Sequence, residues 1–287
     1  MTSKLKEGVM QVVFTLCACV SILAVALICI FLFANGVPTL FKIGPMQFLL
    51  GTTWKPGNDI FGILPMILGS IYVTAGAILV GVPIGLLTAV YMSRFASPAI
   101  NRVMLPAVQL LAGIPSVVYG LVGMIVLVPL IRTTFSLGSG ACLLAAILVL
   151  SIMVLPSIIN VSETALRAVP REYEEASLAL GATAAETYFR VSLHAARSGV
   201  ATAVVLGVGR AIGEAMAIIM VAGNVANMPG LFRSVRFLTT GIISGMSYAP
   251  VGSLYQQALF SIGLVLFLFI MLINVFLNVF IKKRKED

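Results

Sequence analysis

Long apolar runs alternate with short polar stretches along nearly the whole chain. A helix needs about 20 apolar residues to cross a bilayer. The runs predict six spans, at about residues 12–33, 71–92, 103–131, 141–159, 198–225 and 258–281. The uncharged stretch 60–93 is longer than one span requires, so we expect a short interfacial helix over residues 61–70 before the second span. The pattern predicts an all-α integral membrane protein with a single transmembrane domain over residues 1–287.

A polar block over residues 163–197 interrupts this apolar pattern and must lie in water. Pro170, followed by three glutamates within five residues, is typical of a helix start, where no N–H is needed and negative charge is favourable. Gly181 predicts the left-handed end of that helix, and Thr183 with Glu186 predicts a capping box that begins a second helix. Two interpretations stay open: a solvated hairpin between spans, or a docking surface for another protein.

Composition and charge indicate how the chain lies in the membrane. Of its residues, 60% are hydrophobic and 10% charged, and the mean hydropathy is +1.11. The net charge of +8 would suit nucleic acid, but the basic residues lie at span ends without interleaved aromatics. An even number of spans places both termini on one side, and basic residues favour the cytoplasmic side.

The count of basic residues gives the orientation. Twelve lie on the side of the termini: Lys4, Lys6, Arg94, Arg102, Arg167, Arg171, Arg190, Arg197, Lys282, Lys283, Arg284 and Lys285. Five lie on the opposite side: Lys42, Lys55, Arg132, Arg233 and Arg236. Both termini and the polar block are therefore expected in the cytoplasm, with Arg210 inside the bilayer.

The sequence lacks the motifs expected for ATP binding, metal binding or catalysis. The sequence contains no Walker A motif, so the chain is not expected to bind ATP in that way. One histidine and scattered carboxylates offer no metal site or catalytic triad, and no cofactor is expected. The four cysteines lack zinc or redox spacing and are interpreted as core residues. Lys4 and Lys6 before an apolar run resemble a signal peptide, but the run is long and we expect an uncleaved first span.

The third predicted span is interrupted near its middle by Gly113, Pro115 and Gly120. Such a break frees backbone groups that lipid cannot satisfy, and it is tolerated where it is buried in protein or lines a wet cavity. Two interpretations stay open, a wall of a transport pathway and a structural kink. The side chains that would add polar groups to a pathway are Gln109, Ser116 and Tyr119.

Arg210 and Glu214 lie inside the fifth predicted span. A charge at mid-membrane costs roughly 2.5–3.5 kcal/mol on insertion scales, and two charges four residues apart share one face of a helix. They form either a structural ion pair or a substrate or gating site, in which Arg210 exchanges Glu214 for an anion. Gly209 and Gly213 are expected to pack against another helix.

The polar block resembles the EAA loop of ABC-importer permeases. The resemblance rests on Glu175-Ala176-Ser177, Gly181, Val191 and Leu193, although the family has alanine at Ser177 and proline at His194. In that family the first short helix of the loop fits a groove on a cytoplasmic ATPase. The resemblance implies that Glu175, Ala176 and Gly181 couple this chain to such an ATPase.

Three further segments resemble phosphate-importer permeases. They are Arg-Ala-Ile-Gly-Glu at 210–214, Gly-Ile-Pro-Ser-Val-Val-Tyr-Gly at 113–120 and Phe-Gly-Ile-Leu-Pro-Met-Ile at 61–67. Trp54-Lys55-Pro56 favours the PstC-type subunit, and the similarity covers nearly the whole chain. It implies a six-span type I ABC importer permease for inorganic phosphate in a bacterial or archaeal inner membrane, with Arg210, Glu214, Ser116 and Tyr119 along the pathway.

The same resemblance implies partners. These are a second permease subunit of PstA type, two ATPase subunits of PstB type that hydrolyse the ATP, and an extracytoplasmic phosphate-binding protein of PstS type. The chain itself is then not an enzyme. Alternatives are a permease for another oxyanion such as sulfate or molybdate, an ion-coupled secondary transporter or channel, and a scaffold that reports phosphate status without transporting. The EAA-like loop argues against the ion-coupled alternative, which needs no ATPase.

Overall fold

The computed structural model describes the backbone of residues 2–286 and the side chains of residues 7–276. The basic side chains that the charge count placed at the termini lie outside the described side chains: Lys4, Lys6, Lys282, Lys283, Arg284 and Lys285.

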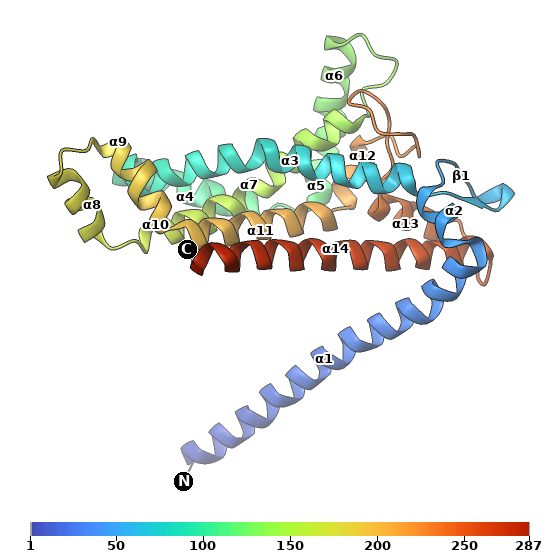
Figure 1. The fold of residues 1–287 in the computed structure, drawn as a ribbon, viewed down its shortest axis with the longest axis horizontal. Coiled ribbons are helices and arrows are strands. Elements are labelled where there is room, and N and C mark those ends of the chain that lie inside the picture. Colours follow the sequence, from blue (N-terminus) through green and yellow to red (C-terminus); the bar gives the residue numbers. More distant parts are fainter. Residues whose placement is uncertain (1, 287) are drawn as a thin grey trace.

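The described chain is almost entirely helical (Figure 1). Its longer helices are α1 (Thr2–Ile43), α3 (Leu64–Val90), α4 (Pro98–Gly113), α7 (Leu143–Arg167), α11 (Arg197–Gly213) and α14 (Leu254–Glu286). The short helices are α2 (Pro45–Leu50), α5 (Ser116–Val122), α6 (Val128–Thr134), α8 (Arg171–Ala179), α9 (Ala184–Glu186), α10 (Leu193–Ala195), α12 (Met216–Val221) and α13 (Leu238–Met246). A 3₁₀ turn η1 (Pro56–Asn58) and π-helical turns η2 (Tyr91–Phe95), η3 (Gly123–Leu127) and η4 (Thr187–Ser192) complete the helical structure. The strands β1 (Trp54–Lys55) and β2 (Ile60–Phe61) pair antiparallel, with Trp54 opposite Phe61.

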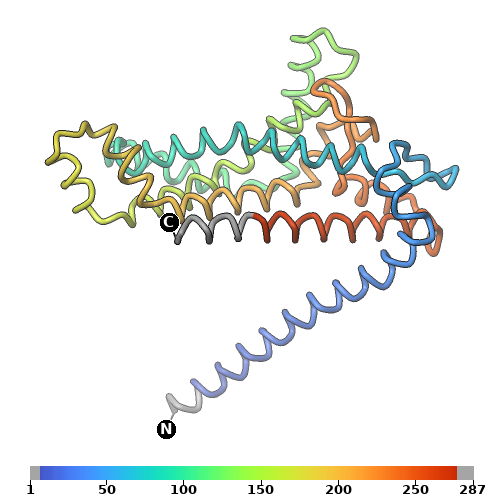
Figure 2. The backbone as a smooth tube through the Cα atoms, viewed as in Figure 1, coloured from blue at the N-terminus to red at the C-terminus, as the bar shows by residue number. Residues whose placement is uncertain are grey.

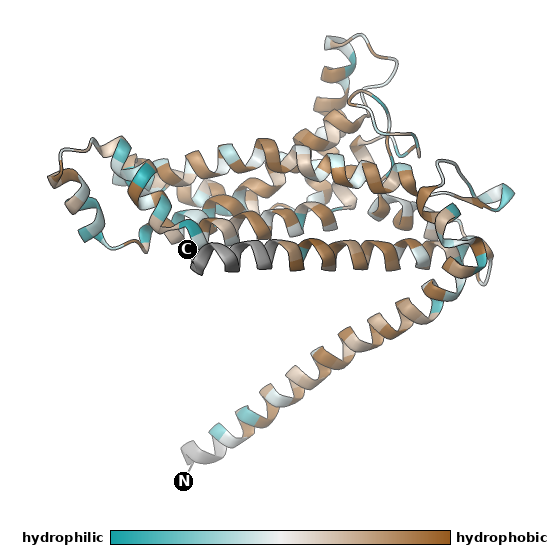
Figure 3. Ribbon diagram, in the orientation of Figure 1, coloured by the Kyte–Doolittle hydropathy of each residue, from teal (hydrophilic) through white to brown (hydrophobic). Residues whose placement is uncertain are grey.

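Helix α7 forms the centre of the bundle, packed against α3 and α11. Glycines on α3 allow a close approach of the two backbones, as the spacing of Gly81 and Gly85 predicts. A Cβ atom would lie 2.8 Å from Val154 at Gly81 and 2.7 Å from Ile158 at Gly85. Apolar surface covers the long helices, and polar surface gathers at the ends of the bundle (Figure 3).

A second core joins the beginning and the end of the chain. Phe48, Phe61 and Leu259 are among its fully buried side chains. The last part of α1 packs against α14, and the Ser261 hydroxyl donates to the carbonyl of Gly36 at 2.9 Å. The rest of α1 diverges from the bundle, whereas α14 runs back along it toward α8 and α9 (Figure 2).

Helix α3 corrects the predicted division of residues 61–92. The structure has one helix from Leu64 to Val90, without a separate interfacial helix over residues 61–70. The first turns stay in line because they are buried against the start of α13 and the loop before it. The Ser70 hydroxyl accepts the amide of Leu238 at 3.1 Å, and both residues are buried.

The described chain has five helices long and apolar enough to cross a membrane, or up to six if one bent pair counts as a span. That pair is residues 184–195 with α11, bent by 74°. The predicted fifth span over 198–225 is therefore wrong as one continuous helix, because α11 ends at Gly213. The predicted third span is divided between α4 and α5, as its glycines and proline suggested.

Helix α7 extends past the predicted end of the fourth span at residue 159 and continues to Arg167. Its last turns contain the start of the polar block. Glu163 is buried, and it forms an ion pair with Arg167 one helical turn later. This pairing lets a carboxylate lie within the helix packing, which apolarity alone does not predict.

Gly209 and Gly213 do not pack as predicted. A Cβ atom at either position would meet nothing within 4 Å in this chain. The glycines that bring α11 close to α7 are Gly199, where a Cβ atom would overlap with Ala165, and Gly207, where it would lie 3.1 Å from Ile158.

Candidate functional site

The break between α4 and α5 is stabilised by a tyrosine. Ile114 and Pro115 have extended backbone, with ψ of 126° and 141°. Because Pro115 has no N–H, the carbonyl of Leu111 loses the donor that a continuous helix would give it. The Tyr119 hydroxyl donates to this carbonyl at 2.8 Å, while the amide of Ile114 reaches it only at 3.4 Å. Tyr119 thus supplies a donor inside an apolar span.

Arg210 lies in the last turn of α11 and is partly buried. At about 1.5 Å per residue it is roughly 20 Å along the axis from the start of α11. Its Nη1 donates to the Ser157 hydroxyl of α7 at 3.3 Å, and the Tyr119 hydroxyl is close enough to interact with it electrostatically. Three elements, α5, α7 and α11, therefore bring polar groups together around one arginine. Ser157 was missed at the sequence level, because a single serine in an apolar run carries no signal.

Glu214 does not share a helix face with Arg210, so that prediction is wrong. Helix α11 ends at Gly213, and Glu214 has extended backbone with ψ 134°. Its carboxylate accepts the amide of Ala217 at 3.0 Å and so satisfies a free N–H at the start of α12. Its carbonyl accepts the Thr239 hydroxyl at 2.9 Å. No ion pair joins Arg210 to Glu214, and the side chain of Arg210 donates its hydrogen bond to Ser157 instead.

Ser116 is the first residue of α5, one residue after the break, and it is partly buried. Its hydroxyl makes no hydrogen bond within the described chain. Gln109, in the last turns of α4, is exposed. The structure therefore brings Tyr119 and Arg210 together and leaves Ser116 beside the break.

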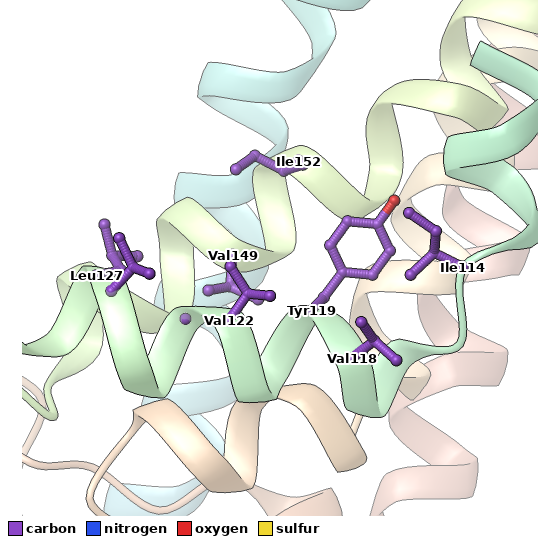
Figure 4. Close-up of a pocket in the computed structure, with 9 residues that line it drawn as sticks. Ile114, Val118, Tyr119, Val122, Leu127, Val149 and Ile152 are labelled. Carbon is purple, nitrogen blue, oxygen red and sulfur yellow. The ribbon is translucent and has the colours of Figure 1, made fainter. Parts of the chain in front are cut away.

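A groove of about 400 Å³ runs beside α5 and η3 (Figure 4). The side chains that line it are apolar apart from the Tyr119 hydroxyl, which points toward the break and not into the groove. An anion would lose its hydration there without gaining a partner. The groove is therefore not the polar site, which lies around Arg210.

The polar block forms a hairpin at one end of the bundle, made of α8, α9, η4 and α10 (Figure 1). Gly181 has φ +88° and ends α8, as predicted. Thr183 and Glu186 form the predicted capping box, with the Thr183 amide donating to the carboxylate at 3.0 Å. These hydrogen bonds lower the pKa of Glu186 from its usual value. The two arms are joined by the hydroxyls of Ser177 and Thr187, 2.9 Å apart.

Glu174 anchors this hairpin to the bundle and was missed at the sequence level. Its carboxylate pairs with Arg94 of η2 at 2.6 Å, and each side chain is only 12% exposed. The same carboxylate accepts the Ser192 hydroxyl at 2.8 Å, and Arg94 also donates to the carbonyl of Leu166 at 2.6 Å. The carboxylate therefore links α8 to η2 and η4, and Arg94 extends the link to the end of α7.

Glu175 and Ala176, the residues predicted to contact another protein, are exposed on α8. Large apolar side chains around them are exposed as well: Tyr173 by 55%, Leu178 by 46%, Leu180 by 90% and Phe189 by 47%. Exposed apolar surface of this kind is typical of a site that contacts another protein or a membrane. The structure thus favours the docking interpretation of the hairpin over the solvated one.

Helices of membrane length packed around a partly buried arginine, with a hairpin exposed at one end, are the architecture of a multi-span membrane permease. Residues 81–286 match the family described as the binding-protein-dependent transport system inner membrane component, and the chain belongs to that family.

Relatives along nearly the whole chain support the same assignment. The chain is 41% identical to a probable ABC transporter permease protein, YqgH, of Bacillus subtilis (strain 168), over 92% of this chain and 88% of the relative. It is 33% identical to the phosphate transport system permease protein PstC of Mesorhizobium japonicum, over 86% and 81%. Among solved structures, an inward-facing MetNI methionine ABC transporter shares the fold, with a TM-score of 0.58 at 21% identity over 83% of this chain and 97% of that chain.

Proposed function

We propose that this chain is a permease subunit of an ATP-driven importer of inorganic phosphate and forms the pathway together with a second permease subunit. The observation that carries the proposal is Arg210, a permanent cation held among apolar helices by one long hydrogen bond to Ser157. A guanidinium offers a fork of donors that matches the oxygens of a phosphate. The PstC relatives along most of the chain support phosphate as the anion.

The pathway is proposed to pass the convergence of α5, α7 and α11. Arg210 exchanges Ser157 for an oxygen of the anion, since a bond of 3.3 Å is easily given up. Tyr119 keeps the broken helix in place and Ser116 offers a hydroxyl beside it. Glu214, already bonded to the start of α12, sets the position of that helix at the end of α11.

We further propose that the hairpin lies in the cytoplasm and docks onto an ATPase subunit. The sequence assigns twelve basic residues to the side of the hairpin and the termini and five to the opposite side, as the positive-inside rule requires for the cytoplasm. Helix α1 begins and helix α14 ends on the side of the molecule where the hairpin lies (Figure 1), so both termini are cytoplasmic as well. The exposed apolar side chains around Glu175 and Ala176 supply the contact, with Gly181 shaping its end.

Because the sequence contains no Walker A motif, ATP hydrolysis is assigned to the partner. The complete importer is then this chain, a PstA-type permease, two PstB-type ATPases and a PstS-type binding protein outside the cell.

Uptake of labelled phosphate by the reconstituted complex tests the proposal. We expect ATP-dependent accumulation that excess unlabelled phosphate abolishes and that sulfate or molybdate at equal concentration leaves intact. Competition by sulfate or molybdate instead would assign the site to another oxyanion. Uptake driven by an ion gradient without ATP would assign the chain to the secondary transporters.

Arg210 is tested in the same assay. Arg210→Gln should abolish uptake while the complex still assembles, and Arg210→Lys should retain part of it, because the charge survives without the fork. The double variant Arg210→Glu with Glu214→Arg should stay inactive, since the two side chains are not paired in this structure. Near-normal uptake by this double variant would show that the two residues form a structural ion pair.

A further inference from the structure

Arg236 is a partly buried cation that forms no ion pair with a carboxylate within the described side chains. It follows the loop after α12 and lies two residues before α13, at the end of the bundle opposite the hairpin (Figure 1). The side chain is partly buried, and its two chain neighbours Val235 and Phe237 are fully buried. Burial lowers the pKa of the guanidinium from its usual value, and the nearby Tyr255 hydroxyl acts in the opposite direction.

One edge of this guanidinium is fixed and the other is free. The Nε of Arg236 donates to the carbonyl of Asn224 at 3.0 Å and to the Oδ1 of the same residue at 3.1 Å. Asn224 has φ +53°, a left-handed conformation that asparagine tolerates better than most residues. The terminal nitrogens Nη1 and Nη2 make no hydrogen bond within the described chain, and neither is buried without a partner. They form a fork of donors that is accessible to water and held in one orientation.

The loop that holds Arg236 is joined to the proposed pathway. Helix α12 begins at the carboxylate of Glu214 and ends three residues before Asn224. Thr239, three residues after Arg236, donates to the carbonyl of Glu214 at 2.9 Å. The six residues of α12 span about 9 Å. Arg236 and Arg210 therefore belong to segments that flank one short helix.

We propose that Arg236 is an outer binding residue for a tetrahedral oxyanion, inorganic phosphate, which it contacts through its two free nitrogens before the anion reaches Arg210. The proposal rests on the phosphate pathway proposed above and adds an outer binding site to it. A partly desolvated guanidinium that lacks a counterion attracts an anion more strongly than an exposed one, because solvent screens it less.

The setting favours a small anion over a carboxylate of a partner protein. Arg236 is drawn back against Asn224 and does not project from the surface. The other basic side chains on this end are exposed: Lys42, Lys55, Arg132 and Arg233. They are better placed to meet a protein, and their field steers an anion toward Arg236 in a salt-dependent way.

The test uses the complete importer in proteoliposomes and measures initial uptake against phosphate concentration at low and high salt. Arg236→Gln should raise the apparent KM for phosphate at least tenfold at both salt concentrations, with the thermal unfolding of the complex unchanged. Arg236→Lys should give an intermediate KM. The matched control is Arg233→Gln, which removes the same charge three residues away at an exposed position and should change KM by less than twofold, and only at low salt.

An unchanged KM in Arg236→Gln overturns the inference, as does an equal shift in Arg233→Gln. Weakened association of the binding protein in Arg236→Gln would show that Arg236 contacts protein, which also overturns it. If Arg236→Gln does not assemble, Arg236→Lys carries the test, since the lysine keeps the charge and loses the fork. Absence of phosphate uptake by the unmodified complex is a different result, because it defeats the proposed function itself.

Discussion

The ion pair between Glu174 and Arg94 gives a specific prediction about how the hairpin is held. In Glu174→Gln the carboxylate charge is lost while the shape of the side chain is kept. Arg94 then has no charged partner and keeps its hydrogen bond to the carbonyl of Leu166, while its Nε is already buried without a partner. The hairpin loses its strongest link to η2.

The magnitude follows from burial. Removing one partner of a fully buried ion pair costs about 3–5 kcal/mol. Both side chains here are 12% exposed, and Arg94 keeps one acceptor, so we expect about 2–3 kcal/mol, below that range. A change of about 2.8 kcal/mol raises the opening constant of a local segment roughly a hundredfold. Helix α8 should therefore detach about a hundred times more often in the variant.

Hydrogen exchange of the α8 amides in the assembled complex measures this opening directly. Glu172→Gln is the matched control, because Glu172 lies on the same helix, is exposed and forms no ion pair. We expect faster exchange along α8 in Glu174→Gln only, together with fewer phosphate ions moved per ATP hydrolysed. Equal exchange in the two variants would refute the anchoring role of Glu174, and a normal transport ratio with faster exchange would separate anchoring from coupling.

Three further predictions concern other parts of the molecule. Tyr119→Phe leaves the carbonyl of Leu111 with one weak donor, so the complex should lose about 1–3 kcal/mol of stability and unfold at a lower temperature. Thermal unfolding of the assembled complex measures this, and Tyr248→Phe, at a site that is 83% exposed, should not change it. Gly181→Val places a branched side chain at φ +88° and should cost about 1–2 kcal/mol and reduce co-purification of the ATPase, whereas Gly181→Asn should be milder; equal yields in both variants would contradict the role of the left-handed cap. The purified chain alone should not hydrolyse ATP, and robust turnover in a preparation free of other subunits would overturn the assignment of hydrolysis to a partner.

Local signals predicted the features that depend on a few neighbouring residues. The capping box of Thr183 and Glu186, the left-handed Gly181 and the break before Ser116 all follow from backbone rules that act over four or five residues. The lengths of the apolar runs likewise predicted a helical membrane protein, because the thickness of the bilayer sets the length of a spanning helix.

Features that depend on where helices end or what they touch were not predictable from periodicity. Arg210 and Glu214 have helical spacing, yet α11 ends between them. The Glu214 carboxylate accepts the amide of Ala217 in α12, and its carbonyl accepts the Thr239 hydroxyl. Glu174 was indistinguishable from its neighbours in the acidic run, and only the fold reveals that it faces Arg94. A helix end or a buried partner is set by tertiary contacts, and these outweigh local preference.

The contact between Gly36 and Ser261 has a consequence for how the protein is made. The two residues are 225 positions apart, so α1 meets this partner only after α14 has been synthesised. At about 5–20 residues per second this interval is roughly 10–45 s. During that time α1 lacks its final neighbour, and the contact between them forms only when α14 arrives.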